Sequence, residues 1–262
     1  MTAPAAPVLV ARDGAIATVT LNNPDRLNAL SRSMWAGLGD VMRALSADEA
    51  LRCVVLRGAG GKAFAAGADI AEFATERADR AQASGYGNLI HATMQAVTRC
   101  RHPVVALIEG ACVGGGLEIA ACCDFRVCGT SSRFGVPIAK LGLTMGYGEL
   151  QGLLALVGRA VATEILLEGR VFDAQEALAK RLVNKVVPDD AVEREATALA
   201  QRIADGAPLV ARWHKQYIAR LGVIPEVSPA EWEEGYACFD TEDYREGVAA
   251  FLAKRKPAFK AR

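Results

Sequence analysis

The chain has little of what several protein classes need. Its 262 residues carry no excess of either charge, because 30 Lys and Arg residues balance 30 Asp and Glu residues. Nucleic-acid binding needs a basic excess for phosphate contacts, so the sequence argues against that partner. The N-terminus has no basic region followed by a long apolar core, and continuous apolar runs are shorter than the ~18–20 residues of a membrane span. We expect a cytoplasmic protein without membrane contact.

Paired cysteines, clustered histidines and common nucleotide motifs are also missing. The seven cysteines include no CxxC pair, and Cys122 and Cys123 are adjacent in an apolar run, which predicts buried free thiols. The three histidines are scattered, so no metal site is expected. No expected strand is followed by GxGxxG, and GxSxG and HExxH do not occur. These gaps argue against a dinucleotide site, a serine-hydrolase elbow and a zinc-protease site.

What the sequence does have is short apolar segments that alternate with helical patterns. Hydrophobic residues make up 52% of the chain, enough for a large core. The expected strands cover 8–12, 16–21, 53–56, 104–108 and 125–128, and the expected helices cover 31–45, 70–100 and 117–122. Two further helices follow Asp173 and Asp190, and the tail after about residue 208 has a helical pattern. Alternating strands and helices predict an α/β fold over residues 8–190.

Two glycine-rich loops follow two of the buried strands. One covers 58–67 and the other 110–116. Each places backbone N–H groups beyond a strand end and close to a helix N-terminus, where they can bind an anion or a developing oxyanion. Small residues allow a ligand to approach the backbone. Two tight turns with no ligand would give the same pattern, and this alternative stays open.

Glu118 favours the catalytic interpretation of these loops. It lies in an otherwise uncharged segment that is expected to be a buried helix. A buried carboxylate is costly unless it is paired, and burial raises its pKa toward the range useful for proton transfer. The structural alternative is an ion pair with a basic residue such as Arg126.

Several segments together resemble the crotonase family, that is, the enoyl-CoA hydratase/isomerase superfamily, over nearly the whole chain. The segments that carry the resemblance are 20–24, 27–30, 64–70, 114–120, 123–124, 245–247 and 251–257. The resemblance implies a crotonase-like spiral of ββα units over residues 1–200. It also implies a C-terminal helical region over 201–262 that mediates assembly into a homotrimer or homohexamer.

The resemblance further implies an acyl-CoA thioester as ligand, with coenzyme A as part of the substrate and no other cofactor. By motif position, the N–H groups of Ala68 and Gly115 would form an oxyanion hole, with Glu118 as the catalytic carboxylate. Lys254 would reach the CoA of a neighbouring subunit. The expected substrate-binding residues are Arg26, Leu27, Ala66, Asp69, Ile70, Gly114, Pro137, Ile138, Gly146, Tyr147, Glu149 and Lys254.

One position departs from the family pattern. Hydratases of the family carry a second glutamate after the Pro of a Phe-Gly-x-Pro-Glu segment, but here Ile138 follows Pro137. Isoleucine cannot accept or deliver a proton, which leaves Glu118 to handle water alone or with help from Glu149 or Tyr147. Three hypotheses remain: an enoyl-CoA hydratase-like lyase; another reaction such as isomerisation, decarboxylation or thioester hydrolysis; and acyl-CoA binding with little turnover. Glu149 could equally be a helix N-terminal acid, and Tyr147 a pocket wall.

Overall fold

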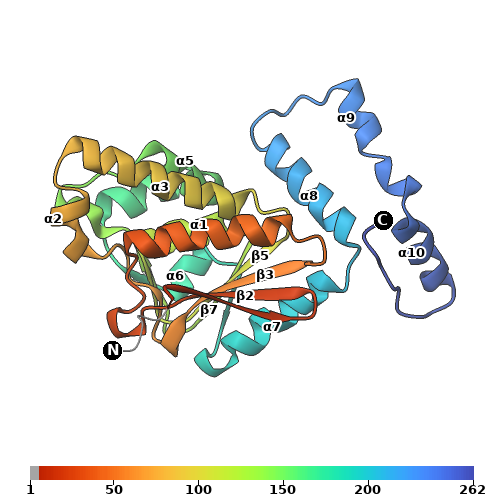
Figure 1. Cartoon of the computed structure of the whole chain (residues 1–262), viewed down its shortest axis with the longest axis horizontal. Coiled ribbons are helices and arrows are strands. Elements are labelled where there is room, and N and C mark those ends of the chain that lie inside the picture. Colours follow the sequence, from red (N-terminus) through yellow and green to blue (C-terminus); the bar gives the residue numbers. More distant parts are fainter. Residues whose placement is uncertain (1–5) are drawn as a thin grey trace.

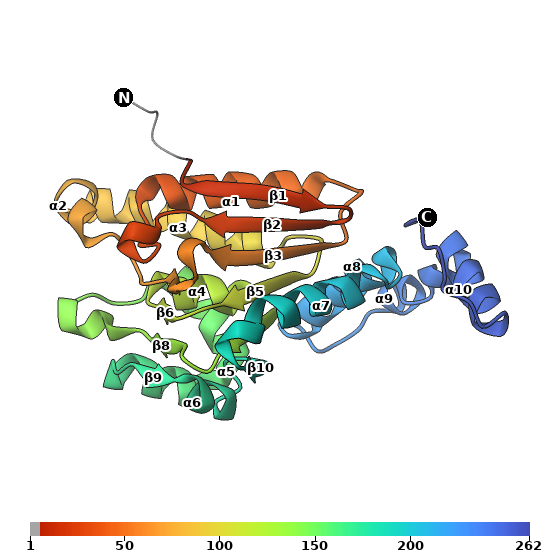
Figure 2. The same ribbon diagram turned by 90° about the horizontal axis from the view of Figure 1, so that it is seen from below.

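A six-stranded sheet forms the centre of the computed structural model, which describes residues 6–262. The strand order is β1-β2-β3-β5-β7-β10, and all pairs are parallel except the β1–β2 hairpin. The strands are β1 (Val8–Asp13), β2 (Ile16–Leu21), β3 (Cys53–Gly58), β5 (Val104–Ile108), β7 (Phe125–Gly129) and β10 (Lys185–Val187). The five strands expected from the sequence are all present. Figure 2 shows the sheet along most of its width.

A second, smaller sheet lies beyond one end of the first. Its order is β4-β6-β8-β9, with strands β4 (Ala63–Ala65), β6 (Ala111–Val113), β8 (Arg133–Gly135) and β9 (Phe172–Asp173). The chain passes from β3 into β4 and from β5 into β6, so each glycine-rich loop connects the large sheet with the small one. Because β4 and β6 pair in parallel, the two loops are brought together.

Helices cover both faces of the large sheet. Val54 and Leu56 of β3 face the core shared with α1 (Arg32–Ala47), α3 (Arg80–Thr98) and α4 (Gly115–Cys122). Cys53 and Val55 face the core shared with α7 (Val192–Ala204) on the other side. Successive side chains of a strand point to opposite faces, and both faces here are buried, which is why residues 53–56 of β3 are all apolar.

The expected helix over 70–100 is interrupted. The chain forms a 3₁₀ turn at Ile70–Glu72, then α2 (Phe73–Glu76), and α3 begins only after Asp79, whose side chain accepts a hydrogen bond from Gln82 N. Asp79 caps α3, so the local capping chemistry overrides the longer helical pattern. The break places residue 77 between two helices.

Helix α5 (Tyr147–Glu168) is the longest helix in the described part of the chain. An 18-residue stretch of its 22 residues has a mean hydropathy of 1.6, so by length and composition alone it could cross a membrane, although charged residues interrupt its apolar runs as expected. Gly158, at φ 72° and ψ 172°, breaks its regular geometry. The remaining helix of the core is α6 (Ala174–Ala179), and Asp173 caps it as expected.

The C-terminal tail is helical, as the sequence predicts. It forms α8 (Pro208–Leu221), α9 (Pro229–Glu234) and α10 (Glu242–Leu252). These helices extend away from the sheet in both views (Figures 1 and 2). They expose large apolar side chains, including Phe251 at 83%. The boundary at residue 200 between the core and the C-terminal region stays a prediction. Helix α7 (Val192–Ala204) spans this position.

Candidate active site

The two glycine-rich loops contact each other at Gly67 and Gly114. Their φ angles are 107° and 51°, which only glycine adopts without strain. A Cβ built on Gly114 would lie 3.5 Å from the Cα of Gly67. Leu30 N donates to Gly67 O at 2.8 Å and Gly114 N donates to Gly135 O at 2.9 Å, so both loops are fixed by backbone hydrogen bonds. The contact places Ala68 and Gly115 on the wall of one cavity.

The N–H groups of Ala68 and Gly115 are free to bind a ligand. Within residues 6–262, neither N–H has an acceptor in the protein. Gly115 is the first residue of α4, where backbone N–H groups have no intrahelical partner and carry the positive end of the helix dipole. In contrast, Ala66 N donates to Leu27 O at 3.0 Å. The cavity therefore contains two unpaired donors of the kind an oxyanion needs.

Glu118 extends from the first turn of α4 into the same cavity. It is only 7% exposed, and no side chain in the described part of the chain forms an ion pair with it. Burial, with a smaller contribution from Glu149, raises the pKa of the Glu118 carboxyl to about 8, while Arg77 opposes the shift. A buried carboxyl with such a pKa can exchange protons near neutral pH.

Arg126 is not the partner of Glu118. Its guanidinium donates to the carbonyls of Leu182 at 2.9 Å and Ala120 at 3.2 Å, and to that of Cys123. It thus satisfies carbonyl groups at the C-terminal end of α4, whereas Glu118 lies near the other end. The alternative prediction of an ion pair between Glu118 and Arg126 is therefore wrong.

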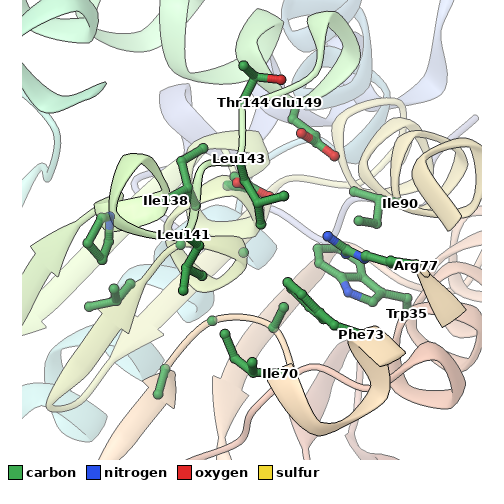
Figure 3. A pocket seen from close by; sticks show the side chains of 18 residues that line it. Trp35, Ile70, Phe73, Arg77, Ile90, Ile138, Leu141, Leu143, Thr144 and Glu149 are labelled. Carbon is green, nitrogen blue, oxygen red and sulfur yellow. The ribbon is translucent and has the colours of Figure 1, made fainter. Parts of the chain in front are cut away.

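The cavity has a volume of about 170 Å³ and mostly apolar walls. Figure 3 shows Ile70, Phe73, Ile90, Leu141 and Leu143 around it. Ile138 lines it too, so the position expected for a second glutamate does face the ligand space. A second carboxylate comes instead from Glu149, whose side chain points into the cavity (Figure 3). One oxygen of Glu149 accepts a hydrogen bond from Gly146 N at 2.6 Å, so this residue also caps α5.

The cavity gathers nine of the fifteen residues predicted from the sequence. Those that line it are Ala66, Ala68, Ile70, Gly114, Gly115, Glu118, Pro137, Ile138 and Glu149. Arg26, Leu27, Asp69, Gly146, Tyr147 and Lys254 lie outside its wall. Roles for these residues along the rest of a CoA molecule stay predictions.

Four of the outer residues have clear surroundings. Arg26 and Asp69 form an ion pair with each other next to the first glycine loop. Tyr147 is 92% exposed at the start of α5 and does not line the cavity of the single chain. Lys254 follows α10 in the distant tail and cannot reach the cavity of its own chain (Figure 1).

Sequence reasoning missed Trp35, Phe73 and Arg77, which all line the cavity. Trp35 lies on the apolar face of α1 and resembles an ordinary core residue. Arg77 lies in a polar stretch that gives no local signal. Only the break between α2 and α3 brings its side chain to the cavity.

We expect Glu118→Gln to increase the free energy of unfolding at pH 8.5 more than at pH 5. The folded-state pKa of about 8 lies above the ordinary 4.5, so between these pH values the folded chain binds more protons than the unfolded chain. Wild-type stability therefore falls as pH rises through this window, while the Gln variant lacks that loss. At ~1.4 kcal/mol per pKa unit, the difference should reach a few kcal/mol. Urea unfolding of the wild type and the variant at both pH values measures this difference. If the free energies of unfolding of the two proteins differ by the same amount at pH 5 and at pH 8.5, Glu118 is not buried as described.

Comparison with known proteins adds independent evidence. A family model described as enoyl-CoA hydratase/isomerase matches residues 11–262. The chain is 36% identical to the short-chain-enoyl-CoA hydratase of Clostridium acetobutylicum, covering 95% of each chain. It is 34% identical to the crotonyl-CoA hydratase of Syntrophomonas wolfei, covering 96% of this chain and 97% of that one. A crystal structure of an enoyl-CoA hydratase/carnithine racemase from Magnetospirillum magneticum superposes with a TM-score of 0.96 at 55% identity, covering 98% and 96%. The predicted fold class is confirmed.

Proposed function

The chain belongs to the enoyl-CoA hydratase/isomerase family, and from that premise we propose that it adds water to the double bond of an enoyl-CoA thioester. The observation that carries the proposal is Glu118, a buried and unpaired carboxyl on the cavity that also holds the free N–H groups of Ala68 and Gly115. A proton-transfer group and an oxyanion hole are the two requirements of enolate chemistry at a thioester.

In this proposal Glu118 acts as the base. Its carboxylate takes a proton from water as the water oxygen bonds to C3 of the substrate. The C2=C3 electron pair moves toward the thioester, and the carbonyl oxygen gains negative charge between the N–H groups of Ala68 and Gly115. The enolate then collapses as C2 takes a proton, either the one that Glu118 has just accepted or one supplied by Glu149, which completes the addition of one water molecule.

Glu149 is the second carboxyl of the proposed mechanism. It shares the cavity with Glu118, and its charge adds to the effect of burial in raising the pKa of the Glu118 carboxyl. Glu149 occupies the role that Ile138 cannot fill, either holding the water or delivering the proton to C2. Tyr147 has no part in this mechanism, since its side chain is exposed.

Ile138 supports a second candidate function. An apolar residue on the cavity wall favours a reaction that needs only one proton-transfer group, such as double-bond isomerisation in the same oxyanion hole. Decarboxylation, thioester hydrolysis and binding without turnover belong to the same set of alternatives.

A panel of acyl-CoA thioesters analysed by mass spectrometry tests the proposal. Hydration adds the mass of one water molecule to an enoyl-CoA, isomerisation leaves the mass unchanged, and decarboxylation and hydrolysis each give a distinct loss. We expect the water adduct. Binding by calorimetry with no product from any thioester would contradict the proposal.

The assembly and location are further parts of this proposal. We infer a homotrimer or homohexamer in the cytoplasm, with Lys254 of one subunit next to the CoA of its neighbour. Exposed apolar residues in α5 and the tail support a covered surface, with Leu167 at 79% and Leu252 at 76% exposed in the single chain. CoA belongs to the substrate, and the proposed steps use no other cofactor.

A further inference from the structure

One cation on the cavity wall has no anionic partner within residues 6–262. Arg77 follows α2, and its side chain lies across the cavity from Ile138 and Leu141 (Figure 3). Its guanidinium packs on the rings of Tyr86 and Phe73, at 4.0 and 4.7 Å from the ring centroids. Within residues 6–262 it forms no ion pair, and its Nε is buried without an acceptor. The positive charge is held in place by aromatic faces rather than by an acid.

The acidic residues around Arg77 are engaged elsewhere. Glu72 accepts a hydrogen bond from Arg32 N at 2.7 Å, and Glu76 forms an ion pair with Arg32 at 3.3 Å. Glu149 accepts from Gly146 N at 2.6 Å. Glu118 is near enough for Arg77 to lower its pKa, but the two side chains do not form an ion pair. The guanidinium is therefore available to a ligand.

A second unsatisfied donor lines the same cavity. Trp35 is 1% exposed, and its Nε1 is buried without an acceptor in the described part of the chain. Indole and guanidinium groups donate hydrogen bonds and never accept them. In the proposed mechanism the thioester carbonyl already has its donors in Ala68 and Gly115, so an acceptor for Arg77 has to come from another part of the ligand.

We propose that the acyl group of the substrate carries a carboxylate and that Arg77 binds it. The inference rests on the proposed function, because it names the acyl class that this same cavity takes. Stacking on two rings leaves the guanidinium without an acidic acceptor among the described residues, and its planar set of N–H donors matches the two oxygens of a carboxylate. An acyl chain with a methyl end would leave the charge of Arg77 partly desolvated and unpaired.

The two glutamates of the cavity do not cancel this attraction. Burial raises the pKa of Glu118 to about 8, so at neutral pH its carboxyl is mainly protonated before the reaction. The carboxylate of Glu149 is stabilised by Gly146 N and by the N-terminus of α5. A carboxylate on the substrate would therefore lie near the unpaired cation of Arg77 and near Glu149, which already accepts a hydrogen bond.

Two probes of equal chain length test the proposal. Both are five-carbon 2-enoyl-CoA thioesters, one with a methyl end and one with a carboxylate end. We expect the wild type to prefer the carboxylate probe by tenfold or more in kcat/KM. Arg77→Gln should lower the ratio between the probes by about tenfold to a hundredfold, as for loss of a charge-assisted hydrogen bond. Arg77→Lys keeps the charge without the planar fork, and its ratio should fall in between.

The ratio separates recognition from an indirect effect on Glu118. Any change in the pKa of Glu118 alters both probes together and leaves the ratio unchanged. Arg32→Gln is the matched control, because it removes a cation 5.9 Å from the same Tyr86 ring but outside the cavity wall. Its ratio should equal that of the wild type. Circular dichroism and thermal unfolding check that each variant folds.

The inference is overturned if the wild type does not prefer the carboxylate probe, or if the Arg77→Gln variant loses both activities equally. If the methyl probe is hydrated without such a preference, the proposed function stands and this inference fails. If neither probe reacts, calorimetry decides with the two saturated five-carbon acyl-CoA analogues. Arg77-dependent tighter binding of the carboxylate analogue would then support this inference while the hydratase proposal fails.

Discussion

Glu118→Gln is expected to lower kcat for enoyl-CoA hydration by about 10²–10⁴-fold, with KM changed much less. Glutamine has the shape of glutamate, so the cavity and the two free N–H groups should remain, but it cannot take a proton from water. The remaining activity would come from the oxyanion hole and from substrate positioning. Disappearance of the conjugated enoyl thioester, followed by absorbance, gives both constants.

The control for this variant is Glu109→Gln. Glu109 follows β5 and pairs with Arg57 at 3.0 Å, outside the cavity. Its substitution should leave kcat within about threefold, as for a partly exposed ion pair far from the reaction. If Glu118→Gln folds and keeps full activity, Glu118 is a structural residue and the proposed site is wrong.

The pH profile gives a second measure of the same role. A base must be ionised, so wild-type kcat/KM should rise with pH and level off above about 8, the pKa to which burial raises the Glu118 carboxyl. The Gln variant should lack this rise.

Local sequence patterns predicted the parts of the fold that depend on local chemistry. The apolar strands at 53–56 and 104–108 are buried on both faces, and Ser31 caps α1 by accepting a hydrogen bond from Met34 N. Glu118 could also be predicted as a functional residue from local sequence, because a single acid in an otherwise uncharged, buried helix is costly unless it is paired. The break after α2 and the whole of α5, with its distortion at Gly158, were missed.

The composition of the cavity depends on contacts between distant segments. Ile138 could be recognised as a departure from the family pattern, but a sequence cannot show which acid faces Glu118 in its place. Glu149 is eleven residues further on, and the turn at Pro137–Leu141 and the start of α5 together bring it to the cavity. Arg77 reaches the cavity only because α3 starts at Arg80 rather than ten residues earlier. These are tertiary effects with no periodicity in the chain.

In the proposed mechanism Glu149, and not Ile138, supplies the second proton-transfer group. Glu149→Gln is expected to lower kcat for hydration by about 10²-fold or more, because the cavity then has one proton-transfer group instead of two. The Gln side-chain oxygen can still accept the hydrogen bond from Gly146 N, so the start of α5 should keep its cap. Rates are measured with the same substrate as for Glu118→Gln.

Ile138→Glu in the Glu149→Gln background completes the test. It places a carboxyl on the cavity wall at the family's usual position. If the second carboxyl can act from either place, the double variant should be at least tenfold faster than Glu149→Gln alone. Ile138→Gln is the matched control, since it adds a polar side chain of the same size without a proton to exchange, and it should recover nothing. Full activity in Glu149→Gln would mean that Glu118 handles water alone. A wild type that hydrates nothing, together with an Ile138→Glu variant that does, would mean that the loss of the glutamate changed the reaction itself.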